Sequence, residues 1–203
     1  MTRIGTLFSA LIFLVFASPA QTAPNTFIHT GSGSGTLNDV SFGALAPLSF
    51  TITANGFTED VEIGLFLSTP HDNASITIAG LGTFDFLVPT MTFVNSIANS
   101  VGFSHINADL FVGPNSAVYD TWQMDTSLGP IAGSTGRLHQ WELINILTTG
   151  GTLFFNVRMN IPATFQAIVG VETPLPAALP LFATGLGALG LMMWRRKQKA
   201  VAA

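Results

Sequence analysis

The chain has 203 residues, of which 48% are hydrophobic and none is cysteine, and its formal net charge is −4. Without cysteine there are no disulfide bonds, no thiol chemistry and no cysteine-ligated metal sites. Residues 21–171 hold ten acidic and only two basic residues, a net charge of −8. This excess argues against binding of nucleic acid or of an anionic membrane surface, because both need a basic face.

The N-terminus has the three parts of a secretory signal peptide. Arg3 supplies a positive charge, Leu7–Phe16 is apolar, and Ser18-Pro19-Ala20 places small residues before a cleavage point after Ala20. We therefore expect residues 1–20 to be a signal peptide that directs export.

The next segment is rich in glycine and serine. Gly31-Ser-Gly-Ser-Gly35 is typical of a flexible connection, so we expect residues 21–35 to be a linker. Residues 36–171 would then form one folded domain, which is long enough to bury a single hydrophobic core.

Apolar and polar residues alternate with period two through this domain. Alternation that is rich in Thr, Phe, Val and Ile predicts half-buried β-strands. Turn residues separate these short strands, which favours an all-β fold, an antiparallel β-sandwich of Ig-like or jelly-roll-like type. The stretch His139–Leu147 fits a helix and a strand equally well. Inward-facing side chains are expected at Phe50, Ile52, Ile63, Leu65, Phe84, Phe86, Phe155 and Val157.

One short segment contains the residue types of a hydrolytic triad. Ser68, His71 and Asp72 lie within five positions, but a triad is defined by its geometry. No G-x-S-x-G elbow occurs in the chain. A turn explains the segment more simply, and we assign no catalytic residue.

Metal-binding patterns are weak as well. Glu59, Asp60 and Glu62 gather carboxylates that could hold Ca²⁺, but they lack the spacing of a calcium loop. A charged edge that discourages pairing between sheets is the simpler explanation. The four histidines, His29, His71, His105 and His139, are widely separated and show no local ligand spacing. We therefore expect no metal and no cofactor.

Three large aromatic residues offer the possibility of sugar binding. Aromatic faces on a β-sandwich can stack on sugar rings, and Trp122 and Trp141 are the candidates for this role. Tyr119 lies three positions before Trp122, so on an ideal strand the two side chains face opposite sides. Burial in the core is the favoured interpretation for all three residues, because large aromatics dominate core packing.

The C-terminal segment has the pattern of a membrane-spanning helix followed by a basic end. Ala177–Trp194 is an uncharged stretch of 18 residues, about 27 Å as a helix, against a bilayer core of about 30 Å. Arg195, Arg196, Lys197 and Lys199 follow it and should remain cytoplasmic. Its G-x-G-x-x-G pattern, residues 185–190, has no acidic residue after it, which argues against dinucleotide binding.

The residues just before that stretch carry a resemblance to a known family. The order of a Thr173-Pro174-Leu175-Pro176-Ala177 motif, a glycine-rich apolar helix and a basic end resembles the PEP-CTERM sorting tail of Gram-negative bacteria, in its VPLPA variant. Thr173 stands in place of the leading valine of that variant, and Leu175 in place of the glutamate of the PEP form. The resemblance assigns residues 172–203 to a sorting tail.

The resemblance also implies partners and a destination. These are export by the secretion machinery, passage through the inner membrane, recognition by an exosortase-type membrane protease, and association with exopolysaccharide or biofilm matrix at the cell surface. We therefore expect an exported, non-enzymatic surface or matrix protein. A carbohydrate-binding module and a permanently anchored single-pass protein remain alternatives, and a hydrolase is the least favoured.

Overall fold

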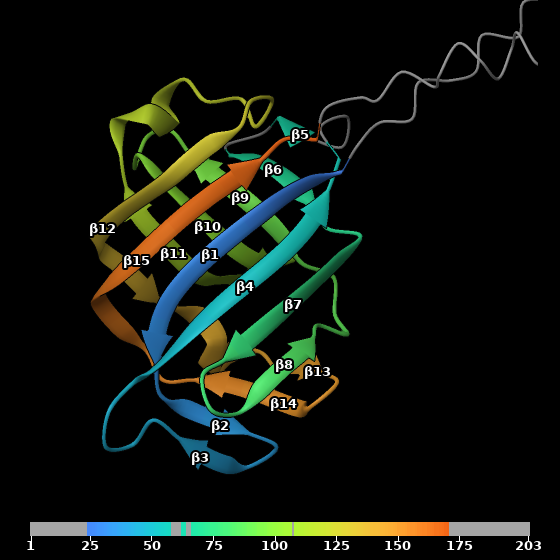
Figure 1. Cartoon of the computed structure of the whole chain (residues 1–203), viewed down its shortest axis with the longest axis vertical. Coiled ribbons are helices and arrows are strands. Elements are labelled where there is room, and N and C mark those ends of the chain that lie inside the picture. The colour runs from blue at the N-terminus through green and yellow to red at the C-terminus, as the bar shows by residue number, and fades with distance from the viewer. Residues whose placement is uncertain (1–23, 58–61, 64–65, 107, 171–203) are drawn as a thin grey trace, which may run out of the picture. The chain divides into compact units, whose positions relative to one another are not determined.

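The computed structural model describes residues 24–57, 62–63, 66–106 and 108–170, and these residues form an all-β fold (Figure 1). They belong to a compact unit that spans Thr22–Val171. The predicted signal peptide, residues 1–20, and the predicted sorting tail, residues 172–203, lie outside the described residues.

Eleven strands form one antiparallel sheet. Their order across the sheet is β5 (Glu62–Ile63), β6 (Leu67–Pro70), β9 (Met91–Asn95), β10 (Ser100–His105), β11 (Ala108–Asn115), β12 (Leu128–Leu138), β15 (Arg158–Ile168), β1 (Asn25–Gly33), β4 (Leu48–Gly56), β7 (Asn73–Ile78) and β8 (Gly82–Asp85).

A smaller antiparallel sheet has the order β13 (Ile146–Thr148), β14 (Gly151–Phe155), β2 (Gly35–Leu37) and β3 (Val40–Phe42). Two 3-10 helices, η2 (Ala117–Asp120) and η3 (Gln140–Leu143), complete the described elements. The ambiguous stretch 139–147 therefore contains a short helical turn and then the start of a strand.

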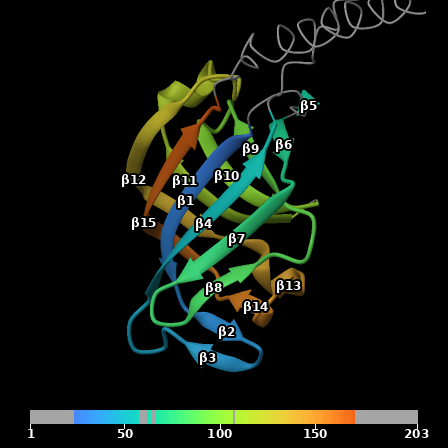
Figure 2. The same ribbon diagram turned by 45° about the vertical axis from the view of Figure 1, so that its right-hand side comes forward.

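The large sheet curls into a half-barrel, so that its two arms lie one behind the other (Figures 1 and 2). We call β15, β1, β4, β7 and β8 the front arm, and β5, β6, β9, β10 and β11 the back arm. The sheet bends at β12, whose pairing with β15 contains several register shifts. Such irregularities bend and twist a strand. The antiparallel all-β prediction is confirmed, but one curled sheet replaces most of the expected two-sheet sandwich.

The hydrophobic core lies between the two arms. Phe50 of β4 contacts Phe111 of β11 edge to face, with ring centroids 5.3 Å apart. At one end of this core Phe155 of the small sheet packs on Phe50, with centroids 5.1 Å apart. The inward prediction is confirmed for Phe50, Ile52 and Phe155, which are buried. Phe84 and Phe86 are partly buried against the same cluster, whereas the side chains of Ile63 and Leu65 lie outside the described residues.

The prediction of a linker at residues 21–35 is wrong from Asn25 onward, because strands β1 and β2 occupy this segment. Residues 25–33 form β1, one of the central strands, with buried and half-buried residues in strict alternation. Glycine occupies the inward positions because side chains from other strands fill the space there. A Cβ on Gly31 would lie 2.7 Å from Cζ of Phe50. A Cβ on Gly33 would lie 2.6 Å from Cδ1 of Leu138. The repeat is thus a period-two pattern with glycine on its inner side, not a flexible segment.

The inward prediction for Val157 is also wrong, since that side chain is 46% exposed. The alternation that includes Phe155 does not continue, because β14 ends there and the chain passes from the small sheet to β15. At this crossing the N–H of Asn156 donates to the carbonyl of Ser34. Val157 falls in the connection, where strand parity has no meaning.

Candidate functional site: a hydroxyl-rich sheet face

A row of threonines crosses the outer surface of the front arm. Strand pairing places Thr30 of β1 beside Thr164 of β15 on one side and Thr51 of β4 on the other. The row continues from Thr51 to Thr77 of β7 and from Thr77 to Thr83 of β8. Five adjacent strands therefore present threonine at the same level. We call the outward side chains of these five strands the hydroxyl face.

Two further rows, both on one side of the threonines, are mostly polar. In one, Gln166, Ile28, Thr53, Ser75 and Asp85 lie side by side. In the next, Oγ1 of Thr26 donates to Oδ1 of Asn55 at 2.9 Å, and Nδ2 of Asn55 donates to Oδ1 of Asn73 at 2.7 Å.

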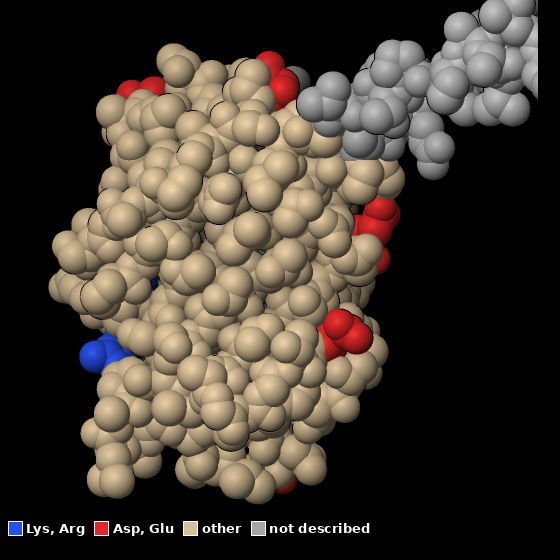
Figure 3. All heavy atoms as spheres, viewed as in Figure 1, with Lys and Arg blue, Asp and Glu red and all other residues tan. Residues whose placement is uncertain are grey.

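The hydroxyl face is almost uncharged. Among the residues of these three rows Asp85 alone carries a charge, and it lies on β8, the outermost strand of the front arm. Figure 3 views this side of the molecule and shows acidic and basic atoms only near its border. The face thus contrasts with a domain whose net charge is strongly negative.

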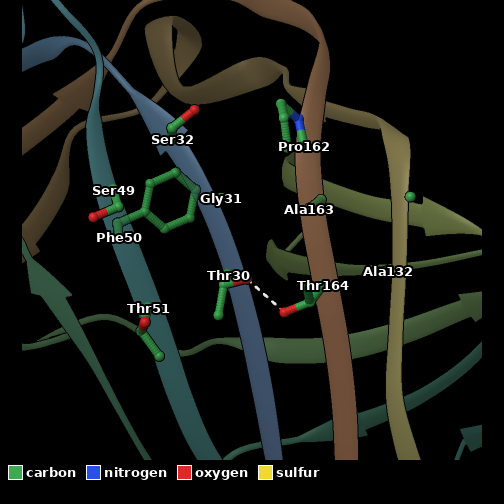
Figure 4. Close-up of a pocket in the computed structure, with 11 residues that line it drawn as sticks. Thr30, Gly31, Ser32, Ser49, Phe50, Thr51, Ala132, Pro162, Ala163 and Thr164 are labelled. Carbon is green, nitrogen blue, oxygen red and sulfur yellow. Dashed lines mark hydrogen bonds between the residues drawn. The ribbon is translucent and has the colours of Figure 1, made fainter.

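A shallow depression of about 380 Å³ lies in this region (Figure 4). Ser32, Ser49, Thr51 and Pro162 lie around it, together with Thr30 and Thr164. The hydroxyls of Thr30 and Thr164 are hydrogen bonded to each other at 2.5 Å. Each hydroxyl carries one donor proton and two acceptor lone pairs. Gly31, Phe50, Ala132, Gly133 and Ala163 complete the lining, so the depression combines these hydroxyl donors and acceptors with a larger apolar surface.

The face follows directly from the strand sequences. Along β4, Phe50, Ile52 and Ala54 point into the core, so Ser49, Thr51 and Thr53 must point outward. Threonine suits these positions because its branched side chain packs well on a pleated surface. The alternation could be found in the sequence, but the row could not, because it depends on strand register and on the order of strands.

The two candidates for sugar stacking are buried, so neither offers an exposed aromatic face to a sugar. Trp122 is 5% exposed, and its Nε1–H donates to the carbonyl of Thr126 at 2.9 Å. Trp141 is fully buried against Phe155, with ring centroids 5.0 Å apart. Tyr119 is fully buried as well. All three belong to hydrophobic core clusters, which confirms the favoured interpretation.

The structure brings together two of the four histidines. Oγ1 of Thr92 lies 3.2 Å from Nε2 of His29 and 3.0 Å from Nε2 of His71. Nδ1 of His71 lies 2.9 Å from Oγ1 of Thr90. Burial holds the pKa of His29 at about 3, with an additional effect from the nearby His71. Burial alone holds the pKa of His71 at about 3.

His71 does not form the hydrolytic site that its neighbours in sequence suggest. Both of its ring nitrogens are bonded to threonines of the back arm. Ser68 lines a different depression, together with Phe66 and Asp109. Burial raises the pKa of Asp109, while His139 and Arg137 act in the opposite direction.

Several predicted site residues lie outside the described parts of the chain. These include Glu59 and Asp60, the motif Thr173–Ala177 and the basic residues Arg195–Lys199. Among the described residues, no three His, Asp or Glu side chains are placed to share a metal ion. In that same part of the chain no helix has the length and apolar character needed to cross a membrane.

Comparison with known family models, curated proteins and solved structures returned no match.

Proposed function

We propose that this chain is an exported, non-enzymatic surface or matrix protein whose hydroxyl face binds a neutral polysaccharide. The observation that carries the binding role is the row of five threonines on adjacent strands, set in a nearly uncharged face. The destination rests on the signal peptide and sorting tail that we expect at residues 1–20 and 172–203. The helix 177–194 would hold the chain in the inner membrane until an exosortase-type protease acts on the segment 173–177.

The chemistry of the face favours an uncharged polyhydroxyl polymer. Threonine hydroxyls can donate to and accept from sugar hydroxyls, while their methyl groups contact the apolar faces of sugar rings. An anionic polymer would be repelled by the acidic domain, and the face has no basic residues among its rows to attract one. Each contact is weak because water competes for it. Useful affinity would therefore come from many contacts along a repeating chain.

Retention of the full-length protein on insoluble neutral and acidic polysaccharides tests the binding role. We expect retention on the neutral polymer with little dependence on salt, because screening affects only charged contacts. Thr51→Glu should weaken retention by placing a charge at the centre of the row. Ser41→Glu, on exposed β3 of the small sheet, is the matched control and should bind normally. Equal binding by the two variants would refute the role of this face.

Intact-mass measurement of the mature protein from its own host tests the export route. We expect loss of residues 1–20 and of the C-terminal helix. Pro174→Ala with Pro176→Ala should block the second cleavage and leave insertion intact. Serine at Arg195, Arg196, Lys197 and Lys199 should abolish retention in the membrane before cleavage. A mature protein that keeps its C-terminal helix would instead favour the permanently anchored alternative.

A further inference from the structure

The two arms of the curled sheet meet at a short segment, Pro70–Asp72, which we call the clasp. It connects β6 of the back arm to β7 of the front arm, two strands that are not neighbours in the sheet. The N–H of His71 donates to the carbonyl of Thr90, next to β9, at 2.9 Å. The N–H of the next residue, Asp72, donates to the carbonyl of Asn55 on β4, also at 2.9 Å. Consecutive amides of the clasp therefore bond to opposite arms.

Close backbone contact reinforces the clasp. A Cβ on Gly56, at the end of β4, would lie 2.5 Å from the carbonyl oxygen of Pro70 and 2.8 Å from Cγ2 of Thr69. Only glycine allows β4 to approach the clasp at this distance. The two arms thus touch here through main chain, with little side-chain material between them.

The half-buried side chain of His71 ties the clasp to the interior. Its ring stacks on Phe103 of β10, with centroids 5.6 Å apart and planes at 17°, and lies 6.0 Å from the ring of Phe27 on β1. Both ring nitrogens bond to threonine hydroxyls. A neutral imidazole has one donor and one acceptor, and two hydroxyls satisfy both.

No carboxylate contacts this ring in the described part of the chain. The back arm contributes Thr90, Thr92 and Phe103, and the front arm contributes Phe27 and, through Thr92, His29. Around His29 lie the rings of Phe103, Phe111 and Phe165, from β10, β11 and β15. Two further ionisable groups belong to these elements: His105 of β10, which bonds to the carbonyl of Pro89, and Asp72 of the clasp itself, which is exposed.

We propose that the clasp is an acid-released latch: protonation of His71 frees Pro70–Asp72 and separates the two arms locally, while the central strands of the front arm stay folded. A cationic ring would lose its acceptor nitrogen and would lie among aromatic rings without an opposite charge, which is a costly environment. Release moves the ring into water, where its charge is solvated.

The expected effect follows from the pKa of His71, about 3 in the closed state against an ordinary value of 6.5. The open state binds the proton more tightly, so opening becomes more favourable as pH falls below 6.5 and levels off near 3. Between pH 7 and pH 5 one histidine of this kind favours opening by about 25-fold.

Hydrogen exchange in the full-length chain, kept in mild detergent, tests the latch. After correction for the intrinsic pH dependence of exchange, the amides of His71 and Asp72 should open about 25-fold more at pH 5 than at pH 7. Amides at the centre of β1 should change far less. His71→Gln keeps a donor and an acceptor but cannot titrate, so its clasp amides should show no such rise. His139→Gln is the matched control and should behave like the wild type.

Three results would overturn the proposal. One is an unchanged rise in the His71→Gln variant. Another is exchange of the β1 amides in parallel with the clasp, which would indicate global unfolding. The third needs no variant: if NMR shows the His71 imidazole of the folded chain titrating near its ordinary value, the ring is not held neutral and the latch does not exist.

Discussion

Threonine plays opposite parts on the two sides of the sheet. On the outer side Thr30, Thr51 and Thr77 stand in a row open to solvent, where water can satisfy any hydroxyl that lacks a protein partner. On the inner side Thr92 is fully buried and lies between the ring nitrogens of two histidines. The presence of threonine alone therefore does not tell whether a position belongs to a candidate binding surface or to a buried structural network. The side of the strand does.

The largest loss of stability is expected when a buried aromatic residue is replaced, compared with an exposed residue nearby. Phe155 is fully buried against Phe42, Phe50 and Trp141. We expect Phe155→Ser to lower the free energy of unfolding by about 3–5 kcal/mol, with a further cost for the buried hydroxyl. Val157→Ser, two positions later on an exposed side chain, should change it by less than about 0.5 kcal/mol. Urea denaturation of the full-length chain compares the two, and similar losses would contradict the end of β14 at Phe155.

Acid should lower the stability of the fold through the two histidines of the inner side, His29 and His71. The unfolded chain binds protons at His29 and His71 near pH 6.5, whereas the folded chain does so only near pH 3. Stability is therefore complete above about pH 6.5 and falls as pH decreases toward 3. From pH 7 to pH 5 we expect a loss of about 2 kcal/mol for each histidine.

The urea midpoint measured at pH 7, 6 and 5 checks this dependence. A variant with both His29→Gln and His71→Gln should lose most of the slope, whatever its stability at pH 7. A wild-type midpoint that stays constant across this range would show that the two histidines are not held neutral in the folded chain.

Thr92→Val removes the hydroxyl that the two histidines share while nearly preserving the shape of the side chain. It should cost about 1–3 kcal/mol, because buried ring nitrogens lose their partner. The loss measured by thermal or urea unfolding should be smaller when His29 has first been changed to Leu, which has no polar atom to bond to Thr92. Fully additive losses would indicate that Thr92 and His29 do not interact.

The sequence alone predicts the alternation but not its three-dimensional result. Strands such as β4 are evident because large apolar residues mark one side. In β1 glycine takes that inner side at Gly31 and Gly33, since Phe50 and Leu138 fill the space from neighbouring elements. The local sequence around β1 does not indicate that these distant side chains fill the space. The threonine row and the histidine pair were missed for the same reason, because both are created by pairing between strands far apart in sequence. The burial of Trp122 and Trp141 in the core, by contrast, is predicted from the size of these side chains alone.

The smallest effect on stability is expected on the hydroxyl face itself. Thr51 lies between Thr30 and Thr77, and its side chain is half-buried on the outer side of β4. Thr51→Val keeps a branched side chain that suits a strand and removes only a hydroxyl that water can reach. We therefore expect a change of less than about 0.5 kcal/mol in the free energy of unfolding. Retention on neutral polysaccharide should nevertheless decrease, because the row loses a donor and an acceptor at its centre. A large loss of stability would mean that the row is a structural ladder, and an unchanged retention would remove it from the binding surface.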